Sequence, residues 1–174
     1  MAIYYTIQRL EAFEKLKKRG FITGDEDKIG DEMQLPYEWM RGQMKKRLLG
    51  YTGEQPIWLW LKKPDMRNSG HDERGKKIVR LTVELDENDV LVSDFSKWHI
   101  VVNDGFYFHT EKEYEDLEKG DIHTSKEESW DRILDEYDDT HAELWGERDS
   151  IILQGVTSRI LIENVKKVEY FIAK

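Results

Sequence analysis

Cysteine is absent from this chain of 174 residues. The absence excludes disulfides, thiol catalysis and thiolate zinc sites, and it fits a reducing compartment, so we expect a cytoplasmic protein. No stretch approaches the roughly 20 apolar residues that a membrane helix needs, and the N-terminus lacks the basic start and long apolar run of a signal peptide. We therefore expect no association with a membrane.

Several common catalytic motifs are missing as well. The sequence has no glycine-rich phosphate loop, no GxSxG and no HExxH. This excludes P-loop nucleotide hydrolysis, α/β-hydrolase chemistry and the commonest metalloprotease chemistry. Apart from His99, the histidines form no pair at metal-ligand spacing, so we expect no histidine metal site. These histidines are His71, His109, His123 and His141.

Charge is distributed unevenly along the chain. The formal net charge is -9, yet residues 111–149 alone contain 16 acidic and 5 basic residues, a net of -11. The rest therefore carries about +2, and the sequence predicts an acidic helical arm beside a mildly basic body. Such acidic runs are usually solvated helix faces. The arm is also a candidate for binding the basic surface of a partner protein.

The aromatic content indicates a folded chain. Six tryptophans and eight tyrosines are many for so charged a sequence, whereas disordered chains are poor in aromatic residues. A length of 174 residues suits one domain, because two independent domains would both be small. We predict a single domain over residues 1–174.

Periodicity predicts strands near both ends and helices between them. Strands are expected at 3–8, 57–61 and 78–85 and near the C-terminus. Helices are expected from Leu10 to a stop at Gly20, from Pro36 towards Gly50, and after a capping box of Ser125 and Glu128. Because regular βαβ alternation is missing, the class is α+β, with a mixed or antiparallel split sheet and flanking helices.

Residues 94–108 allow two interpretations. Phe95, Trp98 and Val102 have helical spacing behind a possible Asp94 cap, whereas "HIVVNDGFYF" could form a hairpin. The spacing favours the helix. The preceding strand at 78–85 is less ambiguous, because its apolar residues alternate with Arg80, Thr82 and Glu84 and one face is therefore expected to be buried.

The stretch "PIWLWLKKPDMR" places Trp58 and Trp60 on one face of a predicted strand. Apolar residues occupy the other face too, and burial preferences favour two core aromatic side chains. The alternative is that one ring lines a pocket. An indole with Lys62 and Arg67 nearby suits a nucleobase and its phosphates.

A second candidate group is "SDFSKWH", with Asp94, Trp98 and His99. His99 could act as a general acid or base, because histidine titrates near neutral pH. The simpler interpretation is structural: Asp94 caps a helix and His99 forms a surface hydrogen bond.

Taken in order, "YTIQ", "YEWMRGQMKKRL", "PIWLWLKKPDMR", "VLVSDFSKWHIVVN" and "ENVKKVEYF" resemble the DUF3841 family, bacterial and phage proteins of unassigned function. The resemblance spans almost the whole chain. It departs from the family near the C-terminus, where "LQGVTSRILI" replaces a segment that tends to contain a tryptophan.

The order of elements is also similar to the ADP-ribosyltransferase fold, especially DNA-modifying toxins of the DarT type. That resemblance implies NAD as a ligand and a late-strand glutamate that supports a cationic transition state. Gln154 falls where this glutamate would be, and a glutamine lacks its charge and basicity. A second departure is the first strand, which has Gln8 and Arg9 but no histidine.

Together these observations predict a pocket that binds a nucleotide-like ligand such as NAD. Glycosidic transfer or hydrolysis at the nicotinamide ribose is the chemistry that the resemblance implies, with Gln154, His99 and Asp94 as the catalytic candidates. The predicted ligand-binding residues are Gln8, Trp58, Trp60, Lys62, Arg67 and Trp98.

Two alternatives remain open. The first is a non-enzymatic reader of single-stranded nucleic acid, in which Trp58 and Trp60 stack on bases and basic residues hold the backbone. Those basic residues are Lys45, Lys46, Lys62, Lys63 and Arg67. The second is a protein-interaction module that acts through the acidic arm.

Overall fold

The structure is a computed structural model that describes residues 1–134 and 151–174. It contains two compact units, one formed by Met1–Leu91 with Gln154–Lys174 and the other by Val92–Leu153. The α+β class and an antiparallel sheet are confirmed. One domain over residues 1–174 stays a prediction, because a compact unit need not fold on its own.

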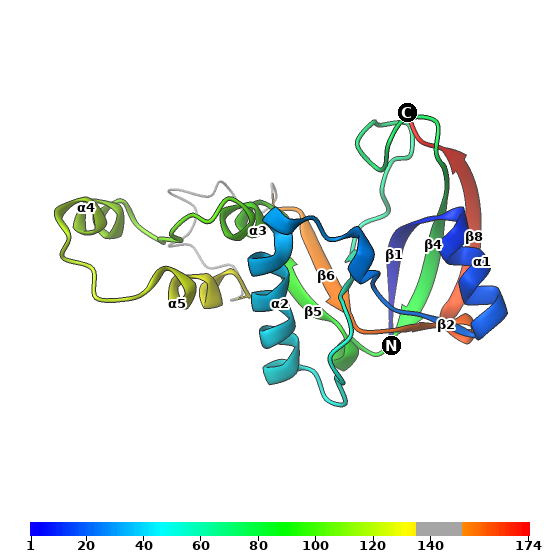
Figure 1. The fold of residues 1–174 in the computed structure, drawn as a ribbon, viewed down its shortest axis with the longest axis horizontal. Helices are drawn as coiled ribbons and strands as arrows, with labels where there is room; N and C mark the ends of the chain where they lie inside the picture. The colour runs from blue at the N-terminus through cyan, green and yellow to red at the C-terminus, as the bar shows by residue number, and fades with distance from the viewer. Residues whose placement is uncertain (135–150) are drawn as a thin grey trace. The chain divides into compact units, whose positions relative to one another are not determined.

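The main sheet has the strand order β5-β6-β3-β1-β4-β8. Strands β1, β4 and β8 lie side by side in Figure 1. Its strands are β1 (Ala2–Arg9), β3 (Ile57–Trp60), β4 (Lys77–Leu85), β5 (Leu91–Asp94), β6 (Leu153–Thr157) and β8 (Val165–Ile172). Strand β5 begins at the last residue before the second unit. A small second sheet pairs β2 (Phe21–Ile22) with β7 (Ile160–Leu161).

Strand β1 is paired unequally on its two sides. Its pairing with β4 runs along the whole strand, from Ala2 opposite Leu85 to Arg9 opposite Ile78. Its pairing with β3 is limited to Tyr5 opposite Trp60. Beyond that pair, the end of β1 and the start of β3 share no ladder, so the sheet opens between these two strands.

Helix α1 (Leu10–Arg19) follows β1 without a linker. It buries Phe13 and Leu16, and the Phe13 ring lies edge-on to Tyr170 of β8 at 6.2 Å. The helix ends where the sequence predicts. Gly20 has a left-handed φ of 83°, and its N–H donates to the Leu16 carbonyl.

Helix α2 (Gln34–Arg47) begins two residues before its predicted start. Pro36 therefore lies in the first turn, where a missing N–H breaks no helical hydrogen bond. Met40 and Met44 are fully buried. The last turn carries Lys45, Lys46 and Arg47, whose charges favour the negative end of the helix dipole.

Arg80 of β4 is more buried than the sequence predicts. It lies on the same face as Thr82 and Glu84, as predicted, but only 7% of it is exposed. Its register partner on β8 is Glu169, which accepts hydrogen bonds from Arg80 Nη2 at 2.9 Å and Nε at 3.3 Å. An ion pair between strands far apart in sequence cannot be deduced from alternation alone.

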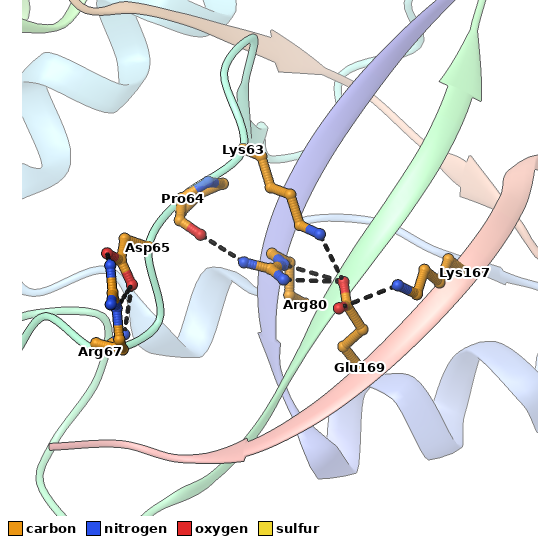
Figure 2. A network of polar contacts seen from close by, with 7 residues as sticks. All are labelled: Lys63, Pro64, Asp65, Arg67, Arg80, Lys167 and Glu169. Atoms are coloured by element: carbon orange, nitrogen blue, oxygen red, sulfur yellow. Dashed lines mark hydrogen bonds and ion pairs between the residues drawn. The ribbon is translucent and has the colours of Figure 1, made fainter.

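Figure 2 shows how this ion pair holds the segment after β3. Arg80 Nη1 donates to the Pro64 carbonyl, and Lys63 Nζ lies 3.5 Å from Glu169. Lys167 contacts the second carboxylate oxygen of Glu169 at 3.2 Å. The hydrogen bonds from Arg80 are the largest cause that lowers the pKa of Glu169, to about 2.

The second unit contains helix α3 (Phe95–Val102), which confirms the helix over the hairpin. Asp94 Oδ1 caps it by accepting from the N–H groups of Ser96 at 2.7 Å and Lys97 at 3.3 Å. The capping box of Ser125 and Glu128 is also confirmed, at the start of helix α5 (Lys126–Trp130). A 3₁₀ turn at Asp131–Leu134 follows.

Helix α4 (Glu111–Lys119) opens the acidic arm. Glu113 accepts hydrogen bonds from Arg132 at 3.0 and 3.1 Å, and Arg132 also donates to the Tyr107 carbonyl at 2.9 Å. Trp130 is fully buried, and its Nε1 donates to the Gly105 carbonyl. The rest of the predicted arm, including Tyr137, lies outside the described residues.

Within the described residues, no helix combines the length and the apolar composition that a membrane crossing requires.

The pairing of Glu169 predicts an acid-dependent contribution to stability. Because its pKa is lower when folded than its ordinary 4.5, ionised Glu169 stabilises the fold above about pH 4.5, and this contribution is lost as the pH falls towards 2. Glu169→Gln should lower the free energy of unfolding at pH 7. The deficit relative to the wild type should shrink between pH 5 and 2, measured by urea unfolding.

Glu163→Gln is the matched control, because Glu163 is an exposed carboxylate in the turn before β8. It should leave the stability at pH 7 nearly unchanged. A Glu169→Gln deficit that stays constant across this pH range would contradict the role given to the ion pair.

Candidate functional site

A cavity of about 350 Å³ lies in the first unit, where β1 and β3 separate. Its walls come from the end of β1, one face of α1, the segment after β2 and the start of β3, with Tyr37 contributed by α2. Small-ligand sites begin at about this volume. The lining residues with polar or aromatic groups or a close backbone contact include Gln8, Lys15, Arg19, Gly24, Tyr37, Gln55 and Trp58.

Two perpendicular aromatic rings form one corner of the cavity. Trp58 of β3 donates from Nε1 to the Tyr37 hydroxyl at 2.9 Å, and the ring planes meet at 74°. Burial raises the pKa of the Tyr37 phenol, and the hydrogen bond from Trp58 offsets part of this rise. Such a corner lets a flat ring lie against one aromatic face with its edge towards the other.

Helix α1 supplies two cations to the same cavity. Ala12, Lys15 and Arg19 follow helical spacing, so they share one face. Neither Lys15 nor Arg19 forms an ion pair within residues 1–134 and 151–174. Asp25 and Glu26 also line the cavity, so the charges of its lining side chains sum to zero. Lys15 and Arg19 are the cations there that can contact an anionic ligand group.

Gly24 and Gln55 join the segment after β2 to the start of β3. The Gly24 N–H donates to the Gln55 carbonyl at 3.0 Å. A Cβ on Gly24 would lie only 2.6 Å from the main-chain oxygens of Gln55 and Pro56, so this wall accepts only glycine without moving. The side-chain Oε1 of Gln55 is buried and has no hydrogen-bond partner among the described residues.

Gln8 lies at the end of β1, where its Nε2 donates to Thr6 Oγ1 at 2.8 Å. The next residue, Arg9, bonds Asp72 through two nitrogens, both at 2.8 Å, and Glu73 at 3.0 Å. These contacts raise the pKa of Arg9 and hold the loop before β4 against β1. Gln8 thus lines both the cavity and a neighbouring hollow bounded by Arg9 and Asp72.

Trp60 and Gln154 are opposite residues in the ladder of β3 with β6. Opposite residues point to the same face, so Trp58, Trp60 and Gln154 share one face of the sheet. Only 4% of Gln154 is exposed, and neither Trp60 nor Gln154 is among the residues that line the cavity.

The predicted cations after β3 lie apart from the cavity lining. Lys62 is exposed, and Arg67 forms a 2.6 Å ion pair with Asp65 (Figure 2). The hydrogen bonds from Arg67 hold the pKa of Asp65 well below its usual range. Arg67, which we predicted to bind the ligand, is thus paired with both carboxylate oxygens of Asp65.

The remaining predicted site residues belong to the second unit. Asp94 caps α3, and Trp98 is buried with 6% exposed. His99 is exposed, and its Nδ1 lies 2.8 Å from the Phe95 carbonyl. Neutral His99 therefore donates from Nδ1 and presents Nε2 as its acceptor.

Of the seven lining residues named above, sequence reasoning predicted Gln8 and Trp58 and missed Lys15, Arg19, Gly24, Tyr37 and Gln55. The spacing of Lys15 and Arg19 was available as a signal, because both share a helix face with Ala12. Gly24 and Gln55 meet across more than 30 residues, and no local pattern predicts that contact.

A comparison with protein-family models finds one match, over residues 3–126, to the family described as Domain of unknown function (DUF3841). The chain belongs to this family. The matched part includes every residue that lines the cavity, whereas β6 and β8, with Gln154 and Glu169, come after it. Neither the curated proteins nor the solved structures contain a match to this DUF3841 protein.

The Gly24 contact generates a stability prediction. Gly24→Ala should lower the free energy of unfolding by about 1 to 3 kcal/mol, because the new methyl group pushes the Gln55 and Pro56 carbonyls away from residue 24. Chemical denaturation measures the change. Gly42→Ala is the control, since a Cβ there meets no atom within 4 Å and alanine favours its helix. Equal stability of the wild type and Gly24→Ala would contradict the close approach.

Proposed function

We propose that this DUF3841 protein binds a nucleotide-like ligand, such as NAD, in the cavity between β1 and β3. The observation that carries the proposal is the combination in one cavity of an aromatic corner and two cations that form no ion pair with any described residue. Trp58 and Tyr37 suit a planar base, and Lys15 and Arg19 suit phosphate oxygens.

The size of the cavity supports one nucleotide half. A volume of about 350 Å³ is at the lower limit of sites for small ligands. A dinucleotide would therefore insert one half and extend the other beyond the opening. This assignment makes a mononucleotide such as AMP the simplest probe of the cavity, with NAD as the larger ligand.

The geometry supports binding more strongly than catalysis. Gln154 is not among the lining residues, and Asp94 and His99 belong to the other unit. ADP-ribosyl transfer or NAD hydrolysis, on a sheet like that of the ADP-ribosyltransferases, thus rests on the sequence resemblance. A glutamine in place of the expected glutamate also removes the charge that would stabilise a cationic transition state.

The alternatives stay predictions with less support. In the nucleic-acid alternative, Lys63 and Arg67 would hold phosphates, but they already contact Glu169 and Asp65. The protein-interaction alternative depends on the acidic arm, of which residues 135–149 lie outside the described part of the chain.

Binding can be measured by isothermal titration calorimetry with NAD and with AMP. Lys15→Ala and Arg19→Ala should each weaken binding by about tenfold, because each removes a charge-assisted hydrogen bond to phosphate. Lys18→Ala is the matched control: it removes a similar charge from α1 at a residue that does not line the cavity. It should change the affinity little.

Two results would contradict this proposal. The first is no binding of either nucleotide at millimolar concentration. The second is equal weakening by Lys15→Ala and Lys18→Ala, which would indicate a general charge effect. Nicotinamide release from NAD, measured in the same samples, tests catalysis separately, and binding without release would retain the binding proposal and remove the transfer chemistry.

A further inference from the structure

The side-chain oxygen of Gln55, in the wall of the cavity, is a buried acceptor without a partner among the described residues. The main chain of Gln55 is held in place, because its carbonyl accepts a hydrogen bond from the Gly24 N–H. Its Oε1 is buried and has no hydrogen-bond partner within the described part of the chain. Buried acceptors are nearly always paired, so an unpaired one in a cavity wall is a candidate to accept a hydrogen bond from a ligand once the amide turns towards the cavity.

The chemistry of an amide limits which ligand groups can be this hydrogen-bond donor. Glutamine presents an acceptor oxygen beside a donor nitrogen, and it pairs in two-pronged fashion with the 6-amino group and N7 of adenine. The terminal torsion of glutamine is soft, so a rotation of the amide brings Oε1 to the cavity face. A purine also covers more of an aromatic corner than a single ring does.

We propose that Gln55 selects a 6-aminopurine nucleotide by accepting a hydrogen bond from its exocyclic amine. The inference rests on the proposed function and deepens it, since it assigns the adenylate half of NAD to the cavity. The base then lies in the corner of Trp58 and Tyr37, and the phosphate lies towards Lys15 and Arg19.

The test compares AMP with purine riboside 5′-monophosphate, which has the same rings, sugar and phosphate but no amino group. Calorimetric titration of the wild type should give AMP an advantage of about tenfold, a usual size for one directed hydrogen bond to a base. Gln55→Met keeps the length of the side chain and removes its polar atoms. This variant should bind the two nucleotides equally, mainly through weaker binding of AMP.

The outcomes separate this inference from the function on which it rests. If wild-type protein binds both nucleotides with equal affinity, the cavity binds nucleotides but Gln55 does not select the amine. If nicotinamide mononucleotide binds more tightly than AMP, the other half of NAD occupies the cavity and the inference is overturned. If none of the three binds, the proposed function is overturned as well.

The preference of the wild type for AMP is measured without any substitution. The proposal can therefore be tested even if the Gln55→Met variant does not fold. Circular dichroism and thermal unfolding should show that Gln55→Met retains the fold, because the main-chain bond from Gly24 to residue 55 is unaffected. A Gln55→Met protein that is folded and still prefers AMP tenfold would also contradict the assignment.

Discussion

The separation of β1 from β3 is the constraint on which the rest of the structure depends. Strand β1 has a complete ladder with β4 but only the pair of Tyr5 and Trp60 with β3. An interrupted ladder leaves main-chain groups that need other partners. The Gly24 N–H donates to the carbonyl of Gln55, just before β3, and so closes one wall of the cavity with backbone. The cavity is therefore bounded by the ends of two strands and by α1 as well as by the segment after β2.

Ion pairs of two arginines hold loop segments against strands β1 and β4. Arg9 clamps the loop at Asp72 and Glu73 against the end of β1, and Arg80 joins Glu169 to the Pro64 carbonyl. Both arginines use several nitrogens at once, which fixes direction as well as distance. A pairing that positions two segments contributes to the shape of a site even where its net contribution to stability is small.

The sequence predicted the local structure well because its signals are local. Gly20, Asp94 and the capping box at Ser125 and Glu128 each act within four residues of a helix end, and all three were confirmed. The buried face of β4 followed from alternation, but the burial of Arg80 on the opposite face did not. Its partner Glu169 is 89 residues away, and only the fold brings the two together. The contact of Gly24 with Gln55 was missed for the same reason.

The register of β3 shows how binding and chemistry can be separated on one sheet face. Gln154 lies opposite Trp60, one strand across and two residues along from Trp58, which corresponds to about 8 Å from the aromatic corner. That spacing is short enough for a dinucleotide with one half in the cavity to extend towards Gln154. However, only 4% of Gln154 is exposed, so a reacting sugar could reach it only if neighbouring side chains moved. The proposed binding would use only residues of β1, α1, α2, β3 and the segments next to them, whereas transfer chemistry would need that additional movement and a charge that glutamine lacks.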